Sequence, residues 1–168
     1  MIFNRWSIKK ILQDIIVTLI IVSIISFGVN YIRRPETEAS IPSLKLLSIE
    51  NRKIDFKLDG KPFIVHFWAT WCPICRFEAP NLDSLHRDGI RVITVAVNSG
   101  SSIDLRKFMK ERGYSYSVIN DISGELAKQF KVEAYPTTFI YDSNGTLQFV
   151  EVGYSTTIGL KARLALIQ

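Results

Sequence analysis

The chain has two cysteines, Cys72 and Cys75, which lie three residues apart between a predicted strand and a predicted helix. The strand is residues 63–69, FIVHFWA, a nearly continuous apolar and β-favouring run that is typical of a strand covered on both faces. The helix is residues 73–86, with Pro73 at its first position, where proline is tolerated. The sequence therefore predicts that both sulfurs lie at the start of a helix that follows a buried strand.

This placement favours redox chemistry at the two sulfurs. Cysteines on a first helical turn can close a small disulfide ring, and the unpaired N–H groups at the helix start stabilise negative charge on Cys72. The thiolate is the form that attacks disulfides, so we expect Cys72 to attack and Cys75, which faces the fold, to act second. An inert structural disulfide is the alternative, but so small a ring restricts the unfolded chain very little.

A metal or haem site does not fit the residues around the cysteines. A structural zinc ion needs four ligands, and the only histidines, His66 and His86, lie on the strand and at the far end of the helix. Haem attachment requires a histidine directly after the second cysteine, where this chain has Arg76. We therefore expect no metal ligand and no cofactor.

The charge distribution argues against a nucleic-acid partner. The chain carries 21 Lys and Arg against 16 Asp and Glu, a net charge of +5. Residues 1–34 hold five of these bases and one acid, so the remainder of the chain is almost neutral. Phosphate binding requires a clustered positive field, which such a domain lacks.

Residues 15–32, IIVTLIIVSIISFGVNYI, contain no charged side chain. A helix of this length covers about 27 Å, close to the roughly 30 Å hydrocarbon thickness of a bilayer. We therefore predict one N-terminal transmembrane helix that contacts lipid through these residues. A cleaved secretory signal is the alternative, but signal cores are shorter and end at small residues, whereas Arg33, Arg34 and Pro35 follow here.

The predicted organisation has three parts. Residues 1–34 form a membrane anchor with a short cytoplasmic flank, residues 35–43 a linker, and residues 44–168 a folded domain. Three basic residues precede the apolar run and two follow it, which favours a cytoplasmic N-terminus. The domain is then held at the inner (cytoplasmic) membrane by a single pass and lies in the periplasm or another extracytoplasmic space.

The folded domain has an α/β pattern. We predict strands at 44–49, 53–56, 63–69, 90–97, 116–119, 137–141 and 148–152, and helices at 73–86, 103–112, 124–130 and 158–167. The first helix carries Ile74, Phe77, Leu82 and Leu85 at mixed helical spacing. A strand, helix and strand in this order imply a parallel pair, whereas Asn144-Gly145 predicts an antiparallel hairpin with positive backbone angles at the turn.

Two motifs of this chain resemble those of the thioredoxin superfamily. They are FWATWCPIC with the following RFEAP, and YPTTF at residues 135–139. The chain is most similar to the membrane-anchored TlpA-like group, which includes cytochrome c maturation reductants and the copper-sensitivity suppressor D proteins. The similarity runs over about residues 44–168 and implies a thioredoxin-like fold with a mixed central sheet flanked by helices.

The resemblance also implies roles for residues around the cysteines. Pro136 is expected to form a cis peptide facing the Cys72–Cys75 pair, with Tyr135 offering backbone hydrogen bonds to an extended substrate. An ordinary trans proline at the start of a strand is the alternative. The other expected substrate contacts are Trp71, Pro73 and Ile74.

Two further residues are candidates for tuning the pKa of the cysteines. Glu78 matches an acidic residue of the TlpA-like group and lies three residues past Cys75, where it can oppose thiol ionisation or relay a proton; a solvated surface acid is the alternative. His66 stands where thioredoxins commonly have a buried aspartate. It either shuttles the Cys75 proton or is a core histidine with its hydrogen bonds satisfied.

The predicted function is a membrane-anchored thiol-disulfide oxidoreductase that acts on extracytoplasmic proteins with disulfides or cysteine pairs, with the dithiol as the working form. A membrane electron donor of the DsbD type would then resupply electrons, as the resemblance implies. The alternative is a copper- or haem-related thiol chaperone that uses the same two sulfurs for binding. Oxidation and isomerisation also stay open. The direction depends on the reduction potential, and a difference of about 30 mV, which corresponds to 1.4 kcal/mol, is finer than a sequence resolves.

Overall fold

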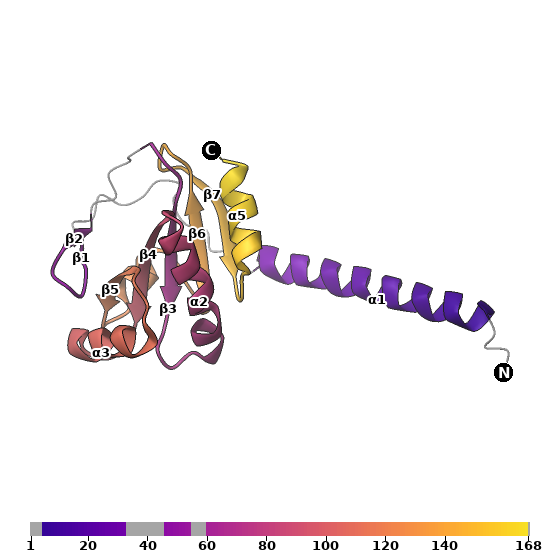
Figure 1. Ribbon diagram of the computed structural model, residues 1–168, viewed down its shortest axis with the longest axis horizontal. Helices are drawn as coiled ribbons and strands as arrows, with labels where there is room; N and C mark the ends of the chain where they lie inside the picture. The colour runs from indigo at the N-terminus through magenta and orange to yellow at the C-terminus, as the bar shows by residue number, and fades with distance from the viewer. Residues whose placement is uncertain (1–4, 33–45, 55–59, 168) are drawn as a thin grey trace. The chain divides into compact units, whose positions relative to one another are not determined.

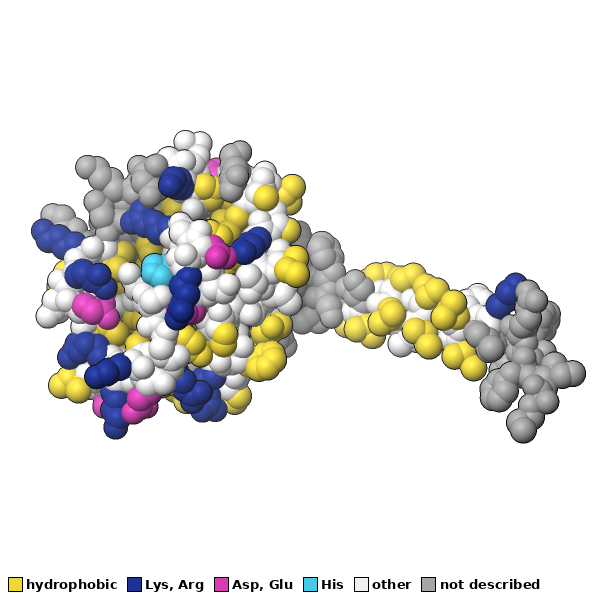
Figure 2. Space-filling view, viewed as in Figure 1, with side chains coloured by type: hydrophobic (Ala, Val, Ile, Leu, Met, Phe, Trp, Pro, Cys, Tyr) yellow, Lys and Arg dark blue, Asp and Glu magenta, His cyan; other side chains and the backbone are white. Residues whose placement is uncertain are grey.

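The chain divides into two compact units, Met1–Arg34 and Pro35–Gln168, and the computed structural model describes residues 5–32, 46–54 and 60–167. The first unit contains helix α1 (Arg5–Ile32), whose described apolar side chains between residues 11 and 25 are exposed (Figure 2). No helix, over its described residues, reaches the length and hydropathy that crossing a bilayer requires. The transmembrane helix expected at 15–32 is therefore not confirmed, and the expected linker at 35–43 lies outside the described residues.

The second unit is built on a five-stranded mixed sheet (Figure 1). Its strands lie in the order β5-β4-β3-β6-β7, with bounds Ser117–Asp121, Arg91–Val97, Phe63–Trp68, Thr137–Tyr141 and Leu147–Val152. β3 pairs in parallel with β4 and antiparallel with β6, β4 pairs in parallel with β5, and β6 pairs antiparallel with β7. The predicted central strand, parallel pair and antiparallel hairpin are confirmed.

A separate two-stranded sheet precedes β3. β1 (Leu46–Leu47) pairs antiparallel with β2 (Lys53–Ile54), so the predicted strand pair is present, with its first strand ending at Leu47 and not at residue 49. Residues 44, 45, 55 and 56, which the prediction included, lie outside the described residues.

Helices cover both faces of the larger sheet. α2 (Pro73–Arg87), α3 (Ser102–Arg112) and α5 (Thr157–Ala165) contribute side chains to the core on one face, and α4 (Glu125–Gln129) contributes to the core on the other. Side chains of β3 alternate between the two cores, as the pleat of a strand requires: Ile64 and Trp68 point to the first, Val65 and Phe67 to the second. β3 is therefore covered on both faces, as its apolar sequence predicts.

Local signals set the ends of the helices. Ser101 and Asp104 form a reciprocal capping box at the start of α3, and Gly113 ends that helix with a positive φ of 68°. Cys72 is the N-cap of α2, with Pro73 in the first turn. These ends fall within one or two residues of the predicted boundaries.

The hairpin turn between β6 and β7 differs from the prediction in one respect. Gly145 has a positive φ of 77°, but Asn144 does not, so the expectation of positive angles from both residues was wrong. The Asp142 carboxylate accepts backbone N–H bonds from Asn144 and Thr146, both at 2.9 Å, and thereby stabilises this turn geometry.

Candidate active site

Cys72 and Cys75 form a disulfide at the junction between β3 and α2. Their Cα atoms are 5.3 Å apart, within the normal range for a disulfide. Cys72 is 6% exposed and Cys75 1% exposed, so the first sulfur is the more accessible of the two. The prediction that Cys75 is shielded is confirmed.

The start of α2 places a backbone hydrogen-bond donor at the Cys72 sulfur. The backbone N–H of Cys75 donates to Cys72 Sγ at 3.2 Å, and Cys72 is the N-cap of a 15-residue helix. An N-cap acceptor at a helix start lies at the positive end of the backbone dipoles. Negative charge on this sulfur, once the disulfide is reduced, is therefore stabilised by the helix.

The loop before β6 lies against the cysteine pair. The Tyr135–Pro136 peptide is cis, as expected, and the Tyr135 carbonyl oxygen is 3.8 Å from Cys72 Sγ. The Pro136 carbonyl in turn accepts the N–H of Gly153 at 2.8 Å, which ties this loop to the end of β7. Segments that are distant in sequence thus meet beside the reactive sulfur.

Trp71 is an exposed but fixed side chain at the edge of the site. Its indole N–H donates to the carbonyl of Asn98 at 3.2 Å, and its ring meets Tyr135 edge to face, with centroids 5.8 Å apart. Pro73 and Ile74, the other predicted contact residues, are also exposed. All three side chains are accessible to a substrate that approaches Cys72.

Glu78 is fully buried, so its interpretation as a solvated surface acid was wrong. Its Oε1 accepts the backbone N–H of Ser155 at 3.2 Å, while its Oε2 has no hydrogen-bond partner within the described part of the chain. Burial raises the pKa of this carboxyl to about 8, partly opposed by the Ser155 hydrogen bond. Glu78 is therefore protonated at neutral pH in the disulfide state.

His66 lies on β3, fully buried, beside its strand partner Thr138. Its Nδ1 is 2.9 Å from Thr138 Oγ1, and burial lowers the pKa of the ring to about 3. The imidazole is therefore neutral throughout the physiological range. These observations favour a core histidine over a proton shuttle, since a shuttle has to titrate near neutral pH.

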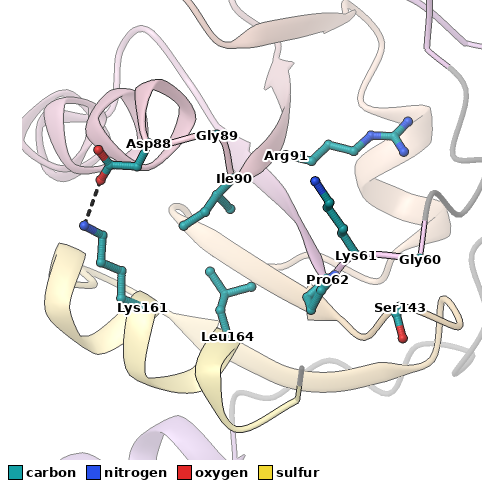
Figure 3. A pocket seen from close by; sticks show the side chains of 10 residues that line it. All are labelled: Gly60, Lys61, Pro62, Asp88, Gly89, Ile90, Arg91, Ser143, Lys161 and Leu164. Atoms are coloured by element: carbon teal, nitrogen blue, oxygen red, sulfur yellow. Dashed lines mark ion pairs between the residues drawn. The ribbon is translucent and has the colours of Figure 1, made fainter.

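Figure 3 shows the residues that line a pocket of about 700 Å³. Because Gly60, Lys61 and Pro62 precede β3, the pocket lies at the opposite end of this strand from the cysteines. Residues that precede β3 and β4 line it together with α5, and Lys161 of α5 forms an ion pair with Asp88 at 2.7 Å. No predicted site residue lines this pocket. Within the described ranges, no group of three or more His, Cys, Asp or Glu could hold a metal ion.

Several partners of the site residues were not predicted from the sequence. They are Asn98 for Trp71, Ser155 for Glu78 and Thr138 for His66. These pairs are separated by 27, 77 and 72 residues. Only the YPTTF motif, which contains Thr138, carried a signal in the sequence.

Comparisons with known proteins agree with this site. The model of the AhpC/TSA family matches residues 37–150. A thioredoxin-like protein of Haemophilus influenzae is 30% identical over 94% of this chain and 95% of its own length. Sporulation thiol-disulfide oxidoreductase A of Bacillus subtilis is 29% identical over 75% of this chain and 81% of its own. A solved thiol:disulfide interchange protein of the thioredoxin family from Chlorobium tepidum has a TM-score of 0.67 and 28% identity, covering 80% of this chain and 97% of that one.

Proposed function

This chain belongs to the AhpC/TSA family, and we propose that it reduces disulfides of extracytoplasmic proteins from a membrane-anchored position. It is a thiol-disulfide oxidoreductase with a thioredoxin-like fold and a Cys72–Cys75 pair. The reducing direction, the substrates, the anchor and the TlpA-like subtype are our proposals. The sequence resemblance and the geometry around Cys72 support the direction, the substrates and the subtype, and the uncharged run at residues 15–32 supports the anchor.

The reaction requires two successive exchanges. The Cys72 thiolate attacks one sulfur of a substrate disulfide, so a Cys72–substrate bond forms and the other substrate sulfur leaves as a thiolate, which takes a proton. The Cys75 thiolate then attacks Cys72 Sγ, which closes the Cys72–Cys75 disulfide and releases the second substrate sulfur. Two electrons pass from the dithiol to the substrate, and a membrane donor of the DsbD type returns them.

The observation that carries this proposal is the hydrogen bond from the Cys75 N–H to Cys72 Sγ at the start of α2. It supports Cys72 as the attacking thiolate and Cys75 as the residue that resolves the intermediate. Cys75→Ser should trap partner proteins on Cys72 as adducts that dithiothreitol releases. The matched control is the double variant Cys72→Ser/Cys75→Ser, which should trap none. Equal recovery of partners with both variants would refute the assignment.

Glu78 supplies a route for the Cys75 proton in this proposal. It lies three residues beyond Cys75 on α2, a spacing at which helical side chains are neighbours, and it is protonated at neutral pH in the disulfide state. When the disulfide is reduced, Glu78 can give its proton to the Cys75 sulfur; when Cys75 attacks, the carboxylate can take a proton back. Glu78→Gln should therefore slow the release of the mixed disulfide without preventing its formation.

The redox direction is tested by equilibrating the full chain with mixtures of glutathione and its disulfide. A reductant should have a potential below that of its compartment, so most of the chain should be in the disulfide state at that poise. A chain that stays reduced there would be an oxidant instead. The proposed substrates are extracytoplasmic proteins with disulfides or cysteine pairs, and the trapping experiment identifies which of them are bound.

The proposed anchor is the apolar segment at residues 15–32. Its support is the run of eighteen residues without charge, flanked by basic residues on both sides. The chain should remain in the membrane fraction after alkaline carbonate extraction, and removal of residues 1–34 should release it. Extraction of the full chain by carbonate would contradict the proposed anchor. So would recovery from cells of a shortened chain that lacks residues 1–34.

A further inference from the structure

Three exposed apolar side chains lie near the cysteine pair, two of them on α2 and one, Trp71, just before its N-cap Cys72. Trp71, Ile74 and Phe77 occur at every third position and are 58%, 51% and 72% exposed. Ile74 and Phe77 are three residues apart on the helix and therefore lie on the same face. By contrast, Leu82 and Leu85 further along α2 are buried in the core. The exposed row therefore begins beside the reactive sulfur and ends at Phe77.

Phe77 is paired with a second exposed ring, Tyr154, from the loop after β7. The ring centroids are 5.3 Å apart, and Tyr154 is 46% exposed. The Tyr154 hydroxyl accepts a hydrogen bond from Asn81 Nδ2 at 3.1 Å, and the same amide donates to the Ser155 carbonyl at 3.0 Å. Asn81 thus fixes the loop to α2 while leaving both rings accessible.

The same loop is also attached to the two halves of the active site. Ser155 donates its N–H to Glu78, and Gly153 donates its N–H to the carbonyl of Pro136 at 2.8 Å. The Phe77–Tyr154 pair is therefore continuous with the segment beside Cys72, and its position is fixed before a partner arrives. Fixed aromatic rings lose little entropy on binding, and tyrosine is enriched among residues that dominate interface energy.

We infer that the Phe77–Tyr154 pair is a second contact point for the protein substrate, where it binds a large apolar side chain near the substrate cysteine. This inference rests on the proposed function. Five residues of helix separate Cys72 from Phe77, about 7.5 Å along the axis. Five residues also rotate about 140° around the helix, and an extended substrate advances about 3.3 Å per residue, so the apolar side chain lies at least three residues from its cysteine. The occupant is thus an extended segment with a cysteine and a nearby leucine, isoleucine or aromatic residue.

The inference is tested with two peptides and the full reduced chain in detergent. Each peptide carries one cysteine as a mixed disulfide with glutathione, and they differ only in leucine or serine at the third position on either side. Attack by Cys72 and closure of the Cys72–Cys75 disulfide release peptide thiol and glutathione, which chromatography measures. The wild-type chain should react about tenfold faster with the leucine peptide, and Phe77→Ala should abolish this preference.

Two controls separate selectivity from general damage. Leu166→Ala removes another exposed apolar side chain, at the C-cap of α5, and should retain the tenfold preference. Phe77→Tyr keeps the ring and should also retain it. A preference that survives Phe77→Ala, or a wild-type chain without any preference, would overturn the inference.

Two further measurements separate substrate binding from self-association and from the redox activity. If sedimentation shows a wild-type dimer that Phe77→Ala dissociates while the preference is unchanged, the surface binds a second copy of this chain and the inference fails. Reduction of glutathione disulfide, which carries no large apolar side chain, tests the proposed function by itself. A wild-type chain that reduces glutathione disulfide but does not discriminate between the peptides keeps the function and loses only the second contact point.

Discussion

Glu78 and Asp83 are two buried acids on the same helix, α2, but their surroundings differ. Asp83 accepts the N–H of Ser115 at 2.7 Å, the Ser115 hydroxyl at 3.0 Å and the Arg87 Nε at 2.6 Å. Burial opposes its ionisation, but these hydrogen bonds and the Arg87 charge hold the pKa of Asp83 below its usual value. Glu78 accepts the N–H of Ser155 at 3.2 Å, and burial raises its pKa to about 8.

Burial dominates at Glu78, whereas the hydrogen bonds and the Arg87 charge outweigh burial at Asp83, and this balance decides the charge of each acid. Asp83 is ionised and joins α2 to the segment before β5 and to Arg87, so its role is structural. Glu78 holds a proton next to the cysteine turn, where a proton can be used. In the proposed function, the first half of α2 therefore serves the redox reaction, with Ile74 and Phe77 exposed on it, and the second half stabilises the fold.

Substitution of the attacking sulfur is expected to have the largest effect. Cys72→Ser should lower the rate of exchange with glutathione disulfide by roughly a thousandfold or more, because serine cannot form the mixed disulfide. Asp83→Asn, in the second half of α2, should leave the exchange rate within about threefold of wild type if the protein remains folded. Stopped-flow kinetics of the reduced chains makes this comparison. A large loss of exchange rate in a folded Asp83→Asn variant would contradict the assignment of the chemistry to the first half of α2 and of stability to the second half.

Glu78→Gln should change how stability depends on pH. Because the folded pKa is about 8, against 4.5 ordinarily, the stabilising protonated state is complete below pH 4.5 and is lost as pH rises through 8. Glutamine keeps an acceptor for Ser155 but cannot ionise. The free energy of unfolding of the variant should therefore exceed that of wild type by several kcal/mol at pH 9, since each pKa unit corresponds to about 1.4 kcal/mol. Urea unfolding of the oxidised chains at pH 5 and pH 9 measures the difference. If the free energy of unfolding changed equally between pH 5 and pH 9 in the two chains, the raised pKa of Glu78 would be contradicted.

Asp83→Ala should show the opposite pH dependence. Its lowered pKa means that the carboxylate stabilises the fold above the ordinary pKa of aspartate, and that this stability is lost as pH falls through the folded value. Removal of the carboxylate leaves Ser115 and Arg87 without this acceptor and should lower the free energy of unfolding by about 2 to 3 kcal/mol at pH 7. The difference should shrink in acid. An acid-insensitive difference would indicate lost packing instead of lost charge.

The smallest effect is expected at the C-terminal end of α2. Asp88→Ala removes the ion pair with Lys161, in which both side chains are about half exposed. Such pairs contribute about 1 kcal/mol or less, and salt screens them. Urea midpoints in low and high salt should differ little between this variant and wild type. A loss of stability as large as that of Asp83→Ala would show that exposure does not explain the different contributions of Asp83 and Asp88.

Local sequence determined the elements and the position of the sulfurs. The apolar run at 63–69, Pro73 and Gly113 act on the backbone within a few residues, so β3, the start of α2 and the end of α3 follow the predictions. The two motifs also predicted the cis peptide before Pro136. The positive angle predicted from Asn144 was wrong, because the Asp142 carboxylate, which the prediction did not include, holds that turn in another geometry.

The tertiary structure decided what the sequence left open at Glu78, His66 and Phe77. Glu78 and His66 depend on Ser155 and Thr138, each more than seventy residues away, and helical spacing by itself does not say which apolar residues of α2 are covered. Burial and hydrogen-bond partners set a pKa, and both are properties of segments that meet only after folding. The sequence alone could thus identify the reactive sulfurs, whereas the protonated Glu78, the neutral His66 and the exposed Phe77 exist because of what packs, or does not pack, against them.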